Sequence, residues 1–307
     1  MNRPEYLKKG DQVAIVSTAR KISLEEIKPA MALLKTWGLK AVVGETIGAK
    51  ENQFAGSDVM RISDFQKMLD NPEIKAIWCA RGGYGTVRII DQLDFTKFKK
   101  HPKWILGYSD VTVLHSHIHN LGFETIHAEM AMDITKKTGL TRSSLRNSLF
   151  GKSHILKYEF QDASYRKGNS KGKLIGGNLS VLYSLCGSPS AIDAKGKILF
   201  IEDLDEYLYH IDRMVQNLKR NGYFENLAGL IVGGMTAMRD NTIAFGFNQD
   251  NPYGKTAKEI INDAVAEYNF PVCFDFPSGH TENNIALVFG REIEMKVSDK
   301  VQIKFLD

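Results

Sequence analysis

The stretch from residue 105 to 112, ILGYSDVT, places a hydroxyl and a carboxylate side by side at the end of an apolar run. Ser109 stands between an expected strand and an expected helix. This is the setting of a nucleophile elbow, in which a sharp turn exposes the hydroxyl and the helix N-terminus favours negative charge. The G-x-S-x-G form is incomplete because position 111 is Val. Ser109 or Asp110 could instead cap the helix, so the residues alone leave both interpretations open.

A glycine-rich turn, RGGYG at residues 81 to 85, follows the preceding apolar run AIWCA. Gly82, Gly83 and Gly85 would let the backbone turn sharply and direct N–H groups at an anion or a developing oxyanion. The turn matches neither of the common phosphate-loop patterns. A plain glycine turn without a ligand is the alternative.

A serine nucleophile needs a base and a group that orients the base. His280 ends the turn FPSGH after the apolar run PVCFDF, and Glu202 ends the run ILFIE. Each could be a surface residue at a strand end, but with Ser109 they give one of the chain orders in which a triad recurs. Asp203, Asp205 and Glu206 are rival carboxylates in the same stretch, IEDLDE. Neighbouring side chains of a strand point to opposite faces, and the spacing does not say which carboxylate faces the site.

The sequence predicts no metal and no other cofactor. His115 and His119 share one face of the helix expected after Ser109, so a metal pair is conceivable, but no H-E-x-x-H carboxylate accompanies them. Packed or solvated helix histidines are the favoured interpretation. No cysteine lies in a zinc-binding spacing.

The first half of the chain predicts a mostly parallel sheet covered by helices, because apolar runs alternate with helical patterns. A capping box at Ser23 and Glu26 and a stop at Gly38 support the first helix. The second helix has an apolar stripe of Val59, Ile62, Phe65 and Leu69. The runs lie at 13–17, 39–43, 76–80 and 104–108, and the helical patterns near 24–37 and 58–69.

The pattern decays into polar and small residues between 151 and 171, which predicts a linker between an N-terminal domain, 1–150, and a C-terminal domain, 172–307. The second half has strand-like runs at 197–203 and 228–234 and helical patterns near 207–221 and 256–268. Four further runs, PVCFDF, IALVF, IEMKV and VQIKF, are predicted to form strands that close a small barrel or a mixed sheet.

Composition narrows the class of protein and its partners. The chain has 307 residues and a formal charge of +4, with 40 basic and 36 acidic residues scattered through both halves, so nucleic acid is not an expected partner. The run from Val13 to Val16 is too short for a signal peptide, and no run is long enough to cross a membrane. Its three cysteines are far apart among apolar neighbours. Reduced thiols in the cytoplasm are the expectation.

The sequence resembles the LD-carboxypeptidase family of serine peptidases, which includes murein tetrapeptide carboxypeptidases and microcin C self-immunity peptidases. The combination of RGGYG, GYSD and the IED-x-x-E segment is specific. The similar stretches run in family order from about residue 8 to 290: KKGDQVAIVS, FAGSDVMRISDFQ, IWCARGGYGT, ILGYSDVT, LIGGNLSVL, LFIEDLDEYLYHIDRM, LIVGGM and FPSGHTENNIALVFG.

The resemblance implies an α/β fold with a Rossmann-like N-terminal domain and a β-rich, barrel-like, swivelling C-terminal α/β domain. It implies that Ser109 is the nucleophile, His280 the base and Glu202 the group that orients His280, in a triad split across two domains. The oxyanion hole would be formed by the backbone N–H of Asp110 with one from Gly82 or Gly83. A homodimer is also implied.

The predicted function is that of a cytoplasmic, metal-independent serine carboxypeptidase that releases D-alanine from a muropeptide tetrapeptide in peptidoglycan recycling. Acyl transfer follows from the residues, and the peptide substrate follows only from the resemblance. Arg81 and Tyr84 are predicted substrate contacts. One alternative is hydrolysis of a peptidyl or aminoacyl nucleotide, with Tyr84, Tyr207 and Tyr209 stacking on a base. Another is a small-molecule binding protein without catalysis.

Two stretches depart from the usual pattern of the family. Ser17-Thr18-Ala19 replaces a frequent proline-serine pair, and His127-Ala-Glu-Met130 replaces a frequent His-Gly-Pro-Met. Both are expected near the substrate. They leave the reaction in place but put the substrate preference in doubt.

Overall fold

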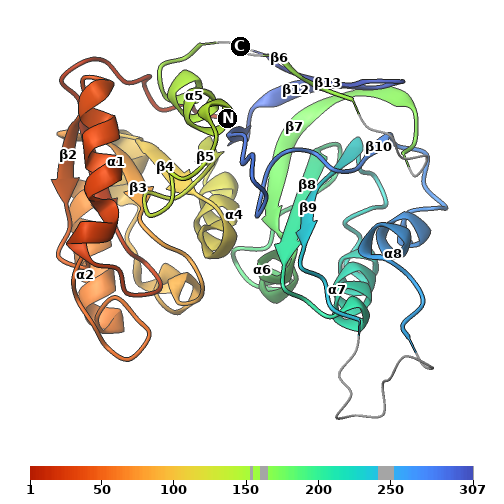
Figure 1. Cartoon of the computed structure of the whole chain (residues 1–307), viewed down its shortest axis with the longest axis horizontal. Coiled ribbons are helices and arrows are strands. Elements are labelled where there is room, and N and C mark those ends of the chain that lie inside the picture. Colours follow the sequence, from red (N-terminus) through yellow and green to blue (C-terminus); the bar gives the residue numbers. More distant parts are fainter. Residues whose placement is uncertain (153–154, 160–164, 241–251, 307) are drawn as a thin grey trace. The chain divides into compact units, whose positions relative to one another are not determined.

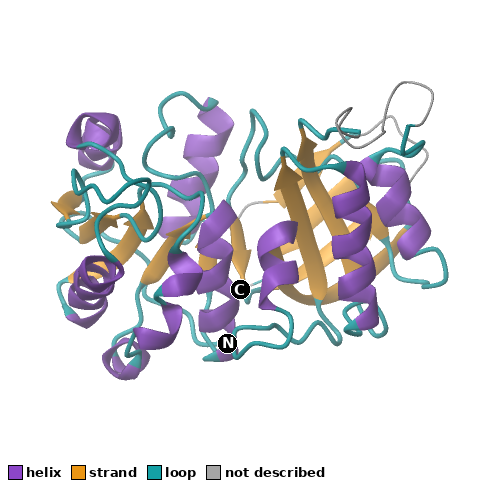
Figure 2. Ribbon diagram, turned by 90° about the horizontal axis from the view of Figure 1, so that it is seen from below, coloured by secondary structure: helices purple, strands orange, loops and turns teal. Residues whose placement is uncertain are grey.

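The computed structural model describes residues 1–152, 155–159, 165–240 and 252–306, and it divides into two compact units (Figure 1). Unit 1 contains Met1–His154 and Glu282–Arg291, and unit 2 contains Ile155–Thr281 and Glu292–Asp307. Each unit has its own sheet with helices against it (Figure 2). The predicted α/β class, a parallel sheet with a second sheet domain, is confirmed.

Unit 1 holds a six-stranded sheet in the order β11-β5-β4-β3-β1-β2, parallel except for β11. The strands are β1 (Gln12–Val16), β2 (Lys40–Val43), β3 (Ile74–Cys79), β4 (Trp104–Gly107), β5 (Thr125–His127) and β11 (Leu287–Phe289). Five α-helices accompany them: α1 (Leu24–Thr36), α2 (Asp58–Asp70), α3 (Thr96–Lys100), α4 (Thr112–Asn120) and α5 (Gly139–Leu149). Three 3-10 turns complete the described part of the unit: η1 (Thr86–Arg88), η2 (Ile90–Gln92) and η3 (Ser109–Val111).

The local signals for the first two helices are largely confirmed. Ser23 and Glu26 form the predicted capping box of α1, which ends just before Gly38. In α2, Phe65 and Leu69 are buried as predicted, but Val59 is 75% exposed. The buried face of α2 runs through Arg61, Asp64, Phe65, Met68 and Leu69, and Val59 and the partly buried Ile62 lie off this face. The predicted stripe is therefore right for Phe65 and Leu69, wrong for Val59 and only partly right for Ile62.

The strand IALVF lies in a different sheet from the one predicted. It forms β11, which pairs antiparallel with β5 in unit 1, Leu287 opposite His127 and Phe289 opposite Thr125. The prediction of one C-terminal barrel or sheet for all four runs is wrong for this strand. Apolar residues show that a strand is buried but do not identify its neighbour, which is set by long-range pairing.

Unit 2 holds a seven-stranded mixed sheet in the order β10-β9-β8-β7-β12-β13-β6. Strands β7 to β10 are parallel, and β12, β13 and β6 continue the sheet antiparallel. The strands are β6 (Ile155–Tyr158), β7 (Gly168–Asn178), β8 (Ile198–Leu204), β9 (Gly229–Thr236), β10 (Val272–Cys273), β12 (Glu292–Val297) and β13 (Val301–Phe305). In Figure 2 the helices of this unit lie against one face of the sheet: α6 (Leu179–Leu185), α7 (Leu208–Arg220) and α8 (Ala257–Ala264).

The predicted linker, 151–171, carries strand β6 and the first residues of β7. Residues 153–154 and 160–164 of that segment lie outside the described residues. The polar composition that suggested a linker reflects the exposed side chains of β6 and of the first half of β7, which alternate with less exposed ones.

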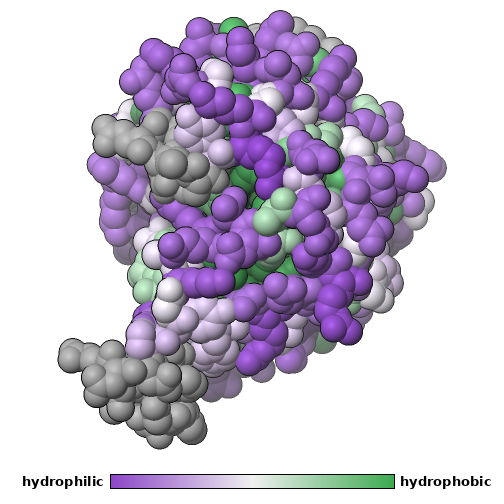
Figure 3. Space-filling view, turned by 90° about the vertical axis from the view of Figure 1, so that its right-hand side faces the viewer, coloured by the Kyte–Doolittle hydropathy of each residue, from purple (hydrophilic) through white to green (hydrophobic). Residues whose placement is uncertain are grey.

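The core of unit 2 lies between its sheet and its helices, where Leu199, Ile201 and Leu230 pack with Ile211 and Ile261. Figure 3 shows a face of the molecule that is largely hydrophilic, with apolar side chains mainly in recesses between polar ones. Among the described residues, no helix combines the length and the apolar character needed to span a bilayer.

Candidate active site

Ser109 occupies a strained turn between β4 and α4. Its φ is +58°, in the left-handed region that a non-glycine residue seldom adopts, and such residues gather at functional sites. Neither η3, which begins at Ser109, nor α4 has a side-chain hydrogen bond at its N-cap. The helix-cap interpretation is therefore wrong, and the turn has the geometry of a nucleophile elbow.

The carboxylate of Asp110 joins this elbow to the RGGYG turn. It is buried, and its Oδ2 accepts a hydrogen bond of 2.9 Å from the backbone N–H of Thr86. Burial raises the pKa of Asp110, and hydrogen bonds from Thr86 and Gly85 oppose that rise. Sequence reasoning considered Asp110 only as a cap and as a backbone donor. The partner Thr86 carries no local signal because it lies on a different loop.

Gly82 brings the RGGYG turn against the nucleophile. A methyl group on Gly82 would lie 3.4 Å from Cβ of Ser109, 3.5 Å from the backbone nitrogen of Asp110 and 2.7 Å from Cε of Met130. The same methyl on Gly83 would meet the Arg20 side chain instead. Of the two predicted second donors, Gly82 is therefore the one whose backbone adjoins both Ser109 and the N–H of Asp110.

The two predicted substrate contacts lie on the same turn. Arg81 donates from Nη1 to the backbone oxygen of Lys21 at 3.1 Å. Tyr84 is 45% exposed, and its ring centroid lies 6.1 Å from that of Phe54. Contact of either residue with a substrate stays a prediction.

Glu202 and His280 meet in unit 2. Oε2 of Glu202 lies 2.7 Å from Nδ1 of His280 and accepts a second bond of 3.1 Å from the backbone N–H of the histidine. Thr236 donates from Oγ1 to the backbone oxygen of His280 at 2.7 Å. Glu202 is fully buried, and the His280 side chain is 15% exposed. A carboxylate that accepts from Nδ1–H selects the tautomer in which Nε2 has the lone pair.

Glycines on two segments allow the close approach of His280 to Glu202. A methyl group on Gly279, where φ is +98°, would lie 2.6 Å from Cγ and Oε2 of Glu202. The pairing of β8 with β9 shifts at the same place, since Ile201 faces Val232 but Asp203 faces Met235. Such an irregularity re-aims a side chain. The sequence indicated the Ser-Gly turn before His280 but not the shift in register between β8 and β9. The glycine pair in LIVGGM is the sequence feature that could have suggested this shift.

Asp203 points away from His280. Its Oδ1 accepts from Nδ2 of Asn178 at 2.9 Å and from the N–H of Leu204 at 2.8 Å, and its Oδ2 accepts from the N–H of Ser180 at 2.9 Å. Burial, followed by the adjacent Glu202, raises the pKa of Asp203 to about 7. The carboxylate that contacts the histidine is therefore Glu202, and Asp203 holds the start of α6.

The histidine pair considered as a metal site does not have the required geometry. His115 uses both ring nitrogens within unit 1: Nδ1 lies 2.8 Å from Oγ1 of Thr125, and Nε2 lies 2.9 Å from the backbone oxygen of Gly107. Burial lowers the pKa of His115 to about 4, so its ring is neutral. The packed-histidine interpretation holds for His115. Within the described ranges, no group of three or more His, Cys, Asp or Glu side chains could hold a metal ion.

We expect a chelator to leave the activity unchanged. The chemistry of Ser109, Glu202 and His280 needs no Lewis acid, and His115 has no nitrogen to offer. Turnover should be measured before and after dialysis against EDTA. Loss of activity that zinc restores would contradict this expectation.

Comparisons with known proteins identify the family. A model described as the LD-carboxypeptidase N-terminal domain matches residues 13–128, which include Ser109. A second, the LD-carboxypeptidase C-terminal domain, matches residues 171–295, which include Glu202 and His280. The chain is 32% identical to the probable murein peptide carboxypeptidase of Bacillus subtilis over 98% of its own length and 93% of that protein.

The chain belongs to the LD-carboxypeptidase family. It is a hydrolase of the serine carboxypeptidase type, as the sequence predicted. Two solved structures share the fold of this LD-carboxypeptidase, each with a TM-score of 0.85. The muramoyltetrapeptide carboxypeptidase of Oxalobacter formigenes is 24% identical, with 96% of this chain and 99% of that chain covered. The protein MccF in complex with glutamyl sulfamoyl guanosine is 21% identical, with 98% of both chains covered.

Proposed function

We propose that Ser109, His280 and Glu202 act as one serine-peptidase triad to which both units contribute. The contact of Glu202 with His280 carries the proposal, because it leaves Nε2 of the histidine as a base. The strained elbow at Ser109 supports the role of nucleophile. Each unit thus contains a preformed half of the site, the nucleophile with its backbone donors in one and the base with its orienting carboxylate in the other.

The reaction follows from these groups. Nε2 of His280 takes the proton of Ser109 as its Oγ attacks the carbonyl carbon of an L,D peptide bond, and the backbone N–H groups of Asp110 and Gly82 stabilise the oxyanion. His280 then gives the proton to the departing amine, which leaves an acyl-enzyme. A water molecule that loses its proton to His280 hydrolyses the ester and restores Ser109.

The substrate we propose is a muropeptide tetrapeptide, from which the enzyme releases D-alanine in peptidoglycan recycling. The names of the relative in Bacillus subtilis and of the Oxalobacter formigenes structure support a murein-type peptide. A cytoplasmic location agrees with three cysteines that form no disulfide. The homodimer implied by the family resemblance stays a prediction.

The experiment that tests this function is incubation of the protein with tetrapeptides that carry lysine or diaminopimelate at the third position. D-alanine release from either one is the expected result. Hydrolysis of a peptidyl or aminoacyl nucleotide, without D-alanine release from any tetrapeptide, would establish the alternative substrate. A serine-reactive phosphonate followed by mass spectrometry should label Ser109. The absence of both turnover and label would favour a small-molecule binding protein without catalysis.

Two of the three tyrosines predicted to stack on a nucleotide base, Tyr207 and Tyr209, already stack on each other. The ring centroids of Tyr207 and Tyr209 lie 5.7 Å apart with an interplanar angle of 16°, and the guanidinium carbon of Arg239 lies 4.6 Å from the centroid of Tyr207. A base would have to displace part of this packing. This packing counts against Tyr207 and Tyr209 as the contacts of a nucleotide base.

Gly82→Ala tests the oxyanion hole. The added methyl would lie against Ser109 and the N–H of Asp110, so we expect kcat to fall about 10²-fold, as for loss of one oxyanion donor. Gly139→Ala is the matched control in the same unit, because a methyl at Gly139 meets nothing within 4 Å. Equal kcat values for the two variants would show that the N–H of Gly82 is not part of the oxyanion hole.

A further inference from the structure

A short segment that follows His280 returns the chain from unit 2 to unit 1. Glu282–Arg291 belongs to unit 1, whereas the residues before and after it belong to unit 2. Its later part forms β11 on the edge of the unit 1 sheet. The base proposed for the triad therefore lies two residues before the chain enters the unit that contains Ser109.

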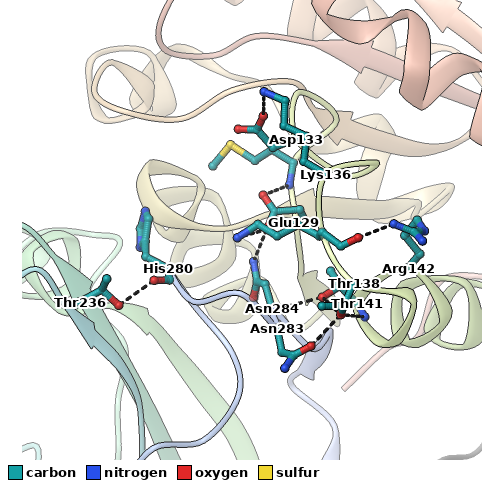
Figure 4. A network of polar contacts seen from close by, with 12 residues as sticks. Glu129, Asp133, Lys136, Thr138, Thr141, Arg142, Thr236, His280, Asn283 and Asn284 are labelled. Atoms are coloured by element: carbon teal, nitrogen blue, oxygen red, sulfur yellow. Dashed lines mark hydrogen bonds and ion pairs between the residues drawn. The ribbon is translucent and has the colours of Figure 1, made fainter.

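The first residues of the return segment are held in unit 1 by side chains from two places in the sequence (Figure 4). Nδ2 of Asn284 donates to Oε2 of Glu129 at 3.2 Å, and the backbone N–H of Asn284 donates to Oγ1 of Thr141 at 3.1 Å. Oγ1 of Thr138 donates to Oδ1 of Asn283 at 2.6 Å. Asn284 is fully buried.

Glu129 is the charged residue among the side chains that anchor Asn284. Its side chain is 2% exposed and lies 3.4 Å from Nζ of Lys137. Burial raises the pKa of Glu129, and the charge of Lys137 opposes the rise. The backbone of Glu129 is held as well, because Nε1 of Trp78 donates a hydrogen bond of 2.9 Å to its backbone oxygen. The next residue, Met130, is the one that packs against Gly82.

His280 has its own anchors in unit 2, where Glu202 holds its ring and Thr236 its backbone oxygen. Between this anchored histidine and the anchored Asn284 stand only Thr281, Glu282 and Asn283. Four residue steps of fully extended chain span at most about 14 Å. The distance between the two anchors is thus limited by the chain itself.

We propose that Glu129 is a positioning residue for the reaction. Residues 281–284 form a tether that carries His280, and Glu129 fixes the unit 1 end of this tether through Asn284. The contact thereby sets how closely the base approaches Ser109. This inference rests on the proposed triad. In this role Glu129 acts through Asn284 and not on the reacting atoms. It acts on kcat by limiting the places that the base can occupy.

Loss of the Glu129 contact would give the end of the tether more freedom to move. A hydrogen bond of 2.9 Å from the N–H of Ala286 to Oγ of Ser144 holds the segment two residues beyond Asn284, and two residues of extended chain span up to about 7 Å. Thr138 and Thr141 would still hold part of the segment. Loss of the Glu129 contact alone should therefore loosen the tether rather than free it. A misplacement of about 1 Å at a catalytic group can lower a rate about 10²-fold.

The test is an exchange of donor and acceptor. Asn284→Asp places a second carboxylate against Glu129, and we expect kcat to fall about 10- to 100-fold with a smaller change in KM. Glu129→Gln together with Asn284→Asp restores one donor and one acceptor in reversed order and leaves a carboxylate near Lys137. We expect kcat of the double variant to return to within about threefold of wild type, as coupled neighbours allow.

Glu124→Gln is the matched control. Glu124 is also a buried carboxylate of unit 1, and it holds the far end of the same segment through Arg291, with Oε2 at 2.6 Å from Nη2. This variant should lower the melting temperature and leave kcat of the folded protein unchanged. Equal losses of kcat in Glu124→Gln and Asn284→Asp, or a double variant no better than Asn284→Asp, would overturn the inference.

Labelling of Ser109 by a phosphonate separates this inference from the proposed substrate. The labelling rate depends on the same base, so Asn284→Asp should slow it and the double variant should restore it. If wild type labels at Ser109 but cleaves no tetrapeptide, the substrate is wrong and the labelling rates still test the tether. Absence of label on Ser109 in wild type would overturn the triad and the inference together.

Discussion

Ser109→Ala should lower kcat about 10⁶-fold, the loss seen when a catalytic serine is removed from a triad. The change removes the only atom proposed to bond to the substrate carbonyl. Little packing is lost, because the side chain is only part-buried in its turn. The melting temperature should therefore stay near that of wild type. Single-turnover release of D-alanine and a thermal melt of the same preparation measure the two effects.

Ser109→Gly separates the backbone from the hydroxyl. Glycine adopts a positive φ without strain, so this variant should be as inactive as Ser109→Ala yet melt at a higher temperature. Near wild-type activity in either variant would exclude Ser109 as the nucleophile. A higher melting temperature for Ser109→Gly than for Ser109→Ala would show that the positive φ at this position costs the fold stability.

The elements that position Ser109 could be predicted because their signals are local. The capping box of α1 lies within four residues of sequence, and the run that ends at Ser109 is bounded by a glycine. The distinction between nucleophile and cap was not local. It depended on φ at Ser109 and on the bond from Thr86 to Asp110, which joins two loops brought together by neighbouring strands β3 and β4.

The sheet to which strand β11 belongs could not be predicted either, because it depends on contacts that are distant in the sequence. Its sequence, LVF, fits either sheet, and the preceding anchors at Asn283 and Asn284 are made to side chains about 140 residues earlier in the chain. Polar residues in such a segment look like an exposed loop when the partner is unknown. The return of the chain to unit 1 could not be predicted from the segment itself.

The choice between Glu202 and Asp203 is decided by which side of β8 each side chain leaves. Strand alternation sends neighbours to opposite faces but does not say which face holds the histidine. In the structure the shift in register between β8 and β9 falls at Glu202, and the turn with Gly279 brings His280 to that side. Asp203 meets the first turn of α6 instead.

Glu202→Gln should therefore lower kcat about 10⁴-fold, because an amide at this position can stabilise the wrong tautomer of His280. The ring Nδ1 and the backbone N–H of His280 both contact Oε2, so an NH₂ group at that place faces both, and an amide oxygen there keeps both bonds but lacks the charge that stabilises the protonated ring. The fold should survive, since the change is isosteric. Turnover and melting temperature are measured side by side with Asp203→Asn.

Asp203→Asn should give the opposite result. Its two oxygens accept from Asn178, Leu204 and Ser180, and an asparagine has one oxygen for these donors. Its NH₂ group would then face an N–H group, which leaves a buried donor unsatisfied at a cost of about 1–3 kcal/mol in the free energy of unfolding. Catalysis in the folded fraction should change little, because Asp203 does not contact His280. If Asp203→Asn instead lost kcat at an unchanged melting temperature while Glu202→Gln stayed active, the carboxylate that orients the base would be Asp203.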